Sequence, residues 1–215
     1  MRTLLPIVAL VAATAAAPAP DPVLHRLIAD AKAMRPVPFE RTQRIEDGGK
    51  VHVYVDRYDP ATSSGYKLVS VDGHAPAASD SLSDWRRTTR NAPPSYSRLA
   101  LLLPASKLVD TAHYHVQPLP KKFMAMNAMG EHAAVDLTID RTGSRPFVRE
   151  ARFFTTEPFR IMMVVKIESF EAINRYVMDA DGGLRIVAQD QTIVMSGLSP
   201  ISRQEIHATF RPLGH

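Results

Sequence analysis

The chain has 215 residues, of which 45% are hydrophobic and 22% are charged, so it is long enough to form one domain with a sizeable core. Its 26 basic and 22 acidic residues give a formal net charge of +4, and the basic residues do not gather into a long stripe. This balance argues against a nucleic-acid partner. The absence of cysteine excludes disulfides, thiolate metal sites and thiol nucleophiles.

The first residues have the pattern of an export signal. Arg2 supplies a positive charge, an apolar run covers residues 4–13, and small residues follow at the positions that a signal peptidase inspects. The apolar run is shorter than the roughly 20 residues needed to cross a membrane. We therefore expect a signal peptide over residues 1–15, cleaved after Ala15 or Ala16, and a soluble mature protein in the periplasm.

Residues 16–36 read as a proline-rich junction followed by a helix. Asp21 is suited to cap this helix and Pro22 to occupy its first position. The apolar residues that recur at helical spacing are Val23, Leu24, Leu27, Ile28, Ala31 and Met34. They form a single stripe, so we expect the helix to lie across a larger element.

Residues 37–215 predict a single β domain that begins with a hairpin. Strands over residues 39–46 and 50–58 flank the turn Asp47-Gly48-Gly49, and a third strand covers residues 66–71. A helical insert then occupies about residues 79–103. It consists of a short helix over residues 79–89 and one or two helical turns over residues 98–103.

After the insert, the pattern predicts strands to the end of the chain. The turns between them are short, which favours an antiparallel meander, because parallel pairing would need long crossovers. The expected strands cover residues 109–117, 123–128, 133–140, 147–155, 160–170, 172–179, 185–190, 192–197 and 203–210.

This order of elements resembles the outer-membrane lipoprotein carriers of bacteria and their relatives, the LolA/LolB-like family. The segments that carry the resemblance are the hairpin at 39–58, the helix around Trp85, the run Arg149-Glu150-Ala151-Arg152-Phe153, Pro158-Phe159, the strand at 161–170 and the turn Asp181-Gly182-Gly183-Leu184. The resemblance implies a mainly β (α+β) fold. A strongly curved antiparallel sheet, an unclosed half-barrel, would be covered by the N-terminal helix and one or two short inserted helices.

The same resemblance implies a concave sheet face that binds the acyl chains of lipoproteins or other lipids. The family also has an arginine important for lipoprotein release, and this chain offers Arg41, Arg44 and Arg57 without an unambiguous counterpart. The exposed hydrophobic loop of the outer-membrane receptor has no counterpart that we recognise. The order of elements therefore resembles that of the family, whereas the release arginine and the receptor loop have no clear counterpart in this chain.

Methionines suggest an apolar binding surface, because their flexible side chains adapt to varied partners. Met124, Met126 and Met163 lie in or beside predicted strands, and ordinary core packing is the alternative explanation. With Tyr54 and Leu68, they form our predicted set of ligand-lining residues.

His113 and His115 are the most suggestive residues for a metal site, because residues two apart on a strand point to one face. His132, with His52 or Asp136, would complete a ligand set. However, the two histidines alternate with apolar residues and therefore belong to the polar face of their strand. The chain has no G-x-S-x-G or H-E-x-x-H motif. We accordingly predict no enzyme, catalytic residue, cofactor or metal ligand.

The sequence therefore predicts an exported periplasmic carrier that holds a lipid, an acyl chain or an acylated protein in the concave face of its sheet. The alternative is a signalling or assembly module that binds an envelope protein through the insert around Trp85 or through a sheet edge.

Overall fold

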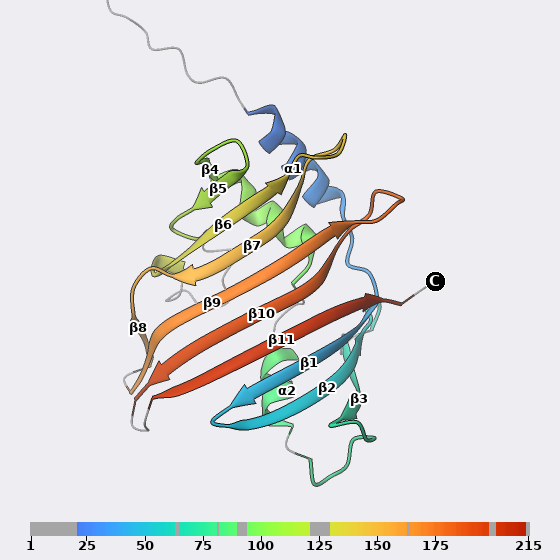
Figure 1. Ribbon diagram of the computed structural model, residues 1–215, viewed down its shortest axis with the longest axis vertical. Coiled ribbons are helices and arrows are strands. Elements are labelled where there is room, and N and C mark those ends of the chain that lie inside the picture. Colours follow the sequence, from blue (N-terminus) through green and yellow to red (C-terminus); the bar gives the residue numbers. More distant parts are fainter. Residues whose placement is uncertain are drawn as a thin grey trace, which may run out of the picture.

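The computed structural model places eleven antiparallel strands of the described chain in one sheet (Figure 1). The residues that it describes are 21–62, 65–80, 82–89, 94–120, 130–162, 164–197 and 201–213. The strands are β1 (Phe39–Asp47), β2 (Lys50–Tyr58), β3 (Tyr66–Val71), β4 (Lys107–Leu108), β5 (His113–Val116), β6 (Ala133–Asp140), β7 (Phe147–Thr155), β8 (Phe159–Met162), β9 (Val165–Met178), β10 (Leu184–Ser196) and β11 (Ser202–Pro212). Their order is β3-β2-β1-β11-β10-β9-β7-β6-β5-β4, and β8 pairs with β9.

The helical segments lie on one face of this sheet, the far face in Figure 1, which we call the helix-covered face. They are α1 (Pro22–Ala33), α2 (Ser83–Thr89) and the 3-10 segments η1 (Tyr96–Leu101) and η2 (Leu103–Ala105). Asp21 caps α1 as predicted, since its Oδ1 accepts a hydrogen bond of 2.9 Å from the backbone N–H of Val23. No helix in the described ranges is long and apolar enough to cross a bilayer.

The main core lies between these helices and the sheet. Along β6, Val135, Leu137 and Ile139 are buried, whereas the residues between them are partly exposed, as the period of two in a strand requires. The helices contribute Leu27 and Leu99 to the same core. The alternating pattern in the sequence therefore separates a face packed under helices from a face toward solvent.

The prediction of a mainly antiparallel β protein with an N-terminal helix and short inserted helices is confirmed. The bounds predicted for β2, β3, β6 and β7 match the structure, while the short helix is confined to residues 83–89. The predicted strand at 109–117 is limited to β5, and a short strand that was not predicted, β4, precedes it at Lys107–Leu108. The predicted strand at 123–128 and the signal peptide at 1–15 lie outside the described residues.

Two predicted breaks are wrong. Residues 165–178 and 184–196 each form one long strand, although we expected interruptions at Glu171 and Gln191. Neither position carries the glycine or proline that a turn between strands favours. Register shifts in the β9–β10 pairing, between Ile186 and Ala188 and again between Val194 and Met195, instead accommodate the length of these strands.

Polar contacts fix α1 to the end of the sheet where the β6–β7 and β9–β10 turns lie. The Nε of Arg145 donates to Asp30 over 2.9 Å, and its Nη1 donates to the carbonyl of Gly182 over 3.0 Å. Asp30 is 7% exposed, so this pair is largely removed from water. At the start of α1, the hydroxyl of Tyr114 on β5 donates to Asp21. The helix is therefore held at both ends.

A first prediction concerns Gly197, where the end of β10 meets the β8–β9 turn. A Cβ added at Gly197 would lie 2.3 Å from the carbonyl oxygen of Val164, so a side chain there must displace backbone. We expect Gly197→Ala to lower the free energy of unfolding by about 1–3 kcal/mol. Gly143→Ala is the matched control, because its Cβ meets nothing within 4 Å. Urea unfolding of both variants tests this, and equal midpoints would contradict it.

A second prediction concerns pH. The hydrogen bond from Tyr114, together with the backbone N–H groups of α1, lowers the pKa of Asp21 below its ordinary 3.8. Because the folded-state pKa is the lower one, the stabilisation by Asp21 is present above the ordinary pKa of 3.8 and is lost as the pH falls from there through the lower folded-state pKa. We expect Asp21→Ala to cost about 0.5–2 kcal/mol at pH 7. The difference from wild type should shrink below pH 4 in urea unfolding, whereas a difference independent of pH would refute the assignment.

Candidate functional site

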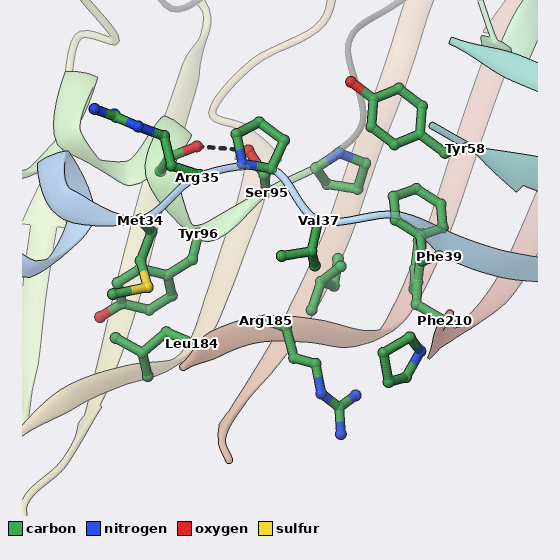
Figure 2. A pocket seen from close by; sticks show the side chains of 15 residues that line it. Met34, Arg35, Val37, Phe39, Tyr58, Ser95, Tyr96, Leu184, Arg185 and Phe210 are labelled. Carbon is green, nitrogen blue, oxygen red and sulfur yellow. Dashed lines mark hydrogen bonds between the residues drawn. The ribbon is translucent and has the colours of Figure 1, made fainter. Parts of the chain in front are cut away.

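A pocket lies on the helix-covered face where the chain passes from α1 into β1 (Figure 2). Its cover is formed by residues 34–37 and by residues 94–97 at the start of η1, and its floor by the ends of β1, β2, β10 and β11. The lining residues are Met34, Arg35, Pro36, Val37, Phe39, Tyr58, Pro94, Ser95, Tyr96, Ser97, Leu184, Arg185, Ile186, Phe210 and Pro212. The pocket therefore joins segments from both ends of the described chain.

The floor is aromatic and aliphatic. Phe39 stacks on Tyr58 with ring centroids 5.1 Å apart, and it meets Phe210 edge-on at 5.2 Å. Strand pairing produces these contacts, because Phe39 is opposite Tyr58 on β2 and opposite the end of β11. Leu184 and Ile186 of β10 continue the floor and are buried. An apolar chain laid on this surface would contact only carbon-rich side chains.

The rim is polar and basic. Ser95 Oγ and Ser97 Oγ form a hydrogen bond of 2.9 Å, drawn as the dashed line in Figure 2. Arg185 forms an ion pair with Asp179, its Nε lying 2.8 and 3.0 Å from the two carboxylate oxygens. Arg35 is exposed at the edge of the lining. Apolar floor and polar rim together make the pocket amphipathic.

The pocket is small, with a volume of about 30 Å³. This is far below the roughly 300–1,000 Å³ of typical ligand sites. Within the described chain, the backbone of residues 35–37 makes no hydrogen bond to the sheet. The next residue, Pro38, accepts a hydrogen bond of 3.2 Å from the backbone N–H of Leu213, and the hydroxyl of Tyr96, in the other part of the cover, accepts one of 2.9 Å from the backbone N–H of Val148. Residues 35–37 are therefore the part of the cover that is held mainly by apolar contacts, and a ligand chain has room only if they move.

A second feature of the helix-covered face is a buried polar cluster beneath α2. Arg41 and Asp56 are 3% and 0% exposed, and they form a two-point ion pair at 2.6 and 3.1 Å. The indole N–H of Trp85 on α2 donates to the same carboxylate over 2.8 Å. The guanidinium of Arg41 lies over the ring of Tyr66, 4.7 Å from its centroid, and burial raises the pKa of Tyr66 to about 12.

This cluster distinguishes the three arginines of the first hairpin. Arg41 faces the helices, whereas Arg44 and Arg57 are exposed and pair with Glu46 and Glu40. The sequence contained a signal for this difference, because Arg41 shares a face of β1 with the buried Phe39 and Ile45. The polar contacts make Asp56 the anchor of α2 on the sheet.

Two of the five predicted ligand-lining residues, Tyr54 and Leu68, lie away from this pocket. Tyr54 is fully buried and belongs to a small core with Ile45, Val71 and Ile206, against which Leu68 and Trp85 pack. Tyr54 and Leu68 thus lie together beneath α2, outside the lining of the pocket. Met124, Met126 and Met163 lie outside the described residues.

Sequence reasoning missed the pocket. Phe39, Tyr58 and Phe210 stand at strand ends and are visible as aromatic residues, but 171 positions separate Phe39 from Phe210. Only the register of β1 against β11 brings their rings together. No local pattern in the sequence predicts which residues of β1 and β11 lie opposite each other.

The histidines of the strands pair with carboxylates. His113 contacts Asp110, and His115 contacts Asp136, each through Nδ1 at 2.8 Å. The buried Tyr114 alternates with them, so both histidines belong to the outer face, as predicted. Among the described residues, no group of three or more His, Asp or Glu side chains is arranged to hold a metal ion.

Comparisons of the chain with protein-family models, with curated proteins and with solved structures find no match. The candidate site is therefore defined by its geometry and chemistry.

A third prediction tests the polar cluster. Asp56→Asn leaves the buried guanidinium of Arg41 without its carboxylate, and we expect a loss of about 3–5 kcal/mol in the free energy of unfolding. Glu46→Gln is the matched control, because it neutralises an exposed pair worth less than about 1 kcal/mol. Trp85 is the only tryptophan, so its emission also reports whether α2 stays docked. Equal urea midpoints for the two variants would contradict the anchoring role.

Proposed function

We propose that this protein is an exported periplasmic binding or carrier protein that holds an apolar ligand, such as a lipid or acyl chain, against the helix-covered face of a strongly curved sheet. The observation that carries the proposal is the pocket beside Phe39 and Phe210. Its floor is apolar, its rim is polar, and the segment over it at residues 35–37 has no backbone hydrogen bond to the sheet in the part of the chain that the structure describes. The resemblance to the LolA/LolB-like carriers points in the same direction.

The proposed mechanism is passive exchange of one apolar cover for another. In the closed state, Met34 and Val37 lie over the floor. On binding, residues 34–37 move away and an acyl chain takes their place, while Tyr96 stays in the core, where its hydroxyl accepts a hydrogen bond of 2.9 Å from the backbone N–H of Val148. Each CH₂ that leaves water contributes about 0.8 kcal/mol, and re-exposing the cover offsets part of this gain. Ligand affinity would then depend on chain length, and no catalytic residue is assigned.

A second candidate function is a module that binds an envelope protein. Val164 is 45% exposed and Ile201 is 72% exposed, at the ends of the β8–β9 and β10–β11 connections. Gly197 at the end of β10 lies beside the carbonyl of Val164, and the start of β11 is at the same end of the sheet (Figure 1). Exposed apolar side chains gathered at one end of a sheet suit a protein partner. Under this function the pocket stays closed.

Native mass spectrometry separates the two functions. The protein would be purified without detergent from the periplasm of its own host, and bound material would be extracted into organic solvent. Adducts of lipid mass would support the carrier and identify its ligand class. A bare chain, together with a co-purifying envelope protein, would favour the partner-binding module.

A fourth prediction tests the pocket with the uncharged fluorophore N-phenyl-1-naphthylamine, whose emission rises in apolar sites. Ile186→Phe adds volume to a floor with about 30 Å³ to spare, so we expect the fluorophore to bind at least about tenfold more weakly than to wild type. Leu108→Phe is the control, because Leu108 is 55% exposed on the edge strand β4. Unchanged binding to Ile186→Phe would place the fluorophore elsewhere.

A further inference from the structure

We propose that the ligand of this pocket is an anionic amphiphile, an acyl chain ending in a carboxylate or phosphate, and that Arg35 binds its charged head. This inference rests on the proposed carrier function and adds the chemistry of the ligand's head group. It is carried by the charges and hydroxyl groups at the rim, which are independent of the apolar floor.

The charges at the rim are unbalanced. Arg35 and Arg185 are the charged residues among those that line the pocket, and no described lining residue is acidic. Arg185 is neutralised by its two-oxygen contact with Asp179. Arg35 is exposed, and no carboxylate of the described chain lies within ion-pair distance of it. The pocket therefore has one uncompensated positive charge at its mouth.

The position of Arg35 at the mouth of the pocket suits the charged head of an amphiphile. Figure 2 shows the guanidinium of Arg35 directed away from the apolar side chains Phe39, Leu184 and Phe210. A head group at this place would stay in water while its chain enters toward Phe39 and Ile186. Guanidinium groups bind carboxylates and phosphates through two parallel hydrogen bonds, which a neutral or cationic head cannot accept in the same way.

The paired hydroxyls provide a second contact. Ser95 and Ser97 are half-buried, and their Oγ atoms are 2.9 Å apart. When one hydroxyl donates to the other, the accepting hydroxyl still has its own proton to donate. An oxyanion held by Arg35 can accept that proton. The rim thus offers a cation and a hydroxyl donor beside an apolar floor, which is the complement of an anionic amphiphile.

The test compares four ligands with the same twelve-carbon chain, below their micelle concentrations: laurate, dodecyl phosphate, dodecanol and dodecyltrimethylammonium. Each displaces N-phenyl-1-naphthylamine from wild type, Arg35→Gln, Arg35→Lys and Lys50→Gln. Lys50→Gln is the matched control, because it removes the same charge at the β1–β2 turn, at the opposite end of β1. Laurate and dodecyl phosphate distinguish a free fatty acid from a phosphate-bearing lipid as the source of the head group.

We expect wild type to bind the anionic ligands at least about fivefold more tightly than dodecanol, with a preference that weakens at high salt. Arg35→Gln should abolish this preference, measured within each variant as the ratio of laurate to dodecanol affinity, Arg35→Lys should keep part of it, and Lys50→Gln should keep all of it. Equal binding of laurate and dodecanol, or an equal loss in Arg35→Gln and Lys50→Gln, would overturn the assignment of Arg35. Failure of the fluorophore to bind wild type would instead remove the carrier function itself, and this inference with it.

Discussion

The central place of β1 in the sheet, paired with β2 on one side and β11 on the other, is the constraint on which both features of the helix-covered face depend. Its pairing with β11 joins the first strand of the chain to the last, in continuous register from Phe39 opposite Pro212 to Asp47 opposite Gln204. Through this long-range pairing, Phe39 meets Phe210 in the floor of the pocket. Its pairing with β2 in the local hairpin places Arg41 directly opposite Asp56, which forms the buried ion pair.

The two covers of this face are held by different forces. Helix α2 is held through Trp85 on the carboxylate of Asp56, which already carries a buried ion pair, and disrupting such a group is costly. Residues 35–37 lack backbone hydrogen bonds to the sheet within the described chain, and they rest on apolar side chains. Apolar contacts are non-directional, so an acyl chain can replace them with little loss. Under the proposed carrier function, the α1–β1 connection, rather than α2, is therefore the segment that would yield to a ligand.

The outer face of the sheet carries charged side chains. His207, Asp190, Arg175 and Glu150 form a row of ion pairs that crosses β11, β10, β9 and β7. These groups are partly exposed, and such pairs contribute little each to stability. These pairs keep the charged side chains on the solvent face of the sheet, whereas the apolar side chains of the strands are directed to the helix-covered face.

The sequence by itself determined the local elements. Alternation and glycine-containing turns located most strands, and Asp21 with Pro22 marked the start of α1, because these signals act over a few residues. Tertiary structure decided what those elements bring together. The register of β1 against β11 involves residues more than 150 positions apart, so the contact of Phe39 with Phe210 has no local signature. The continuity of β9 and β10 was likewise decided by pairing with their neighbours, since backbone hydrogen bonds across the sheet outweigh the weak strand propensity of a single polar residue.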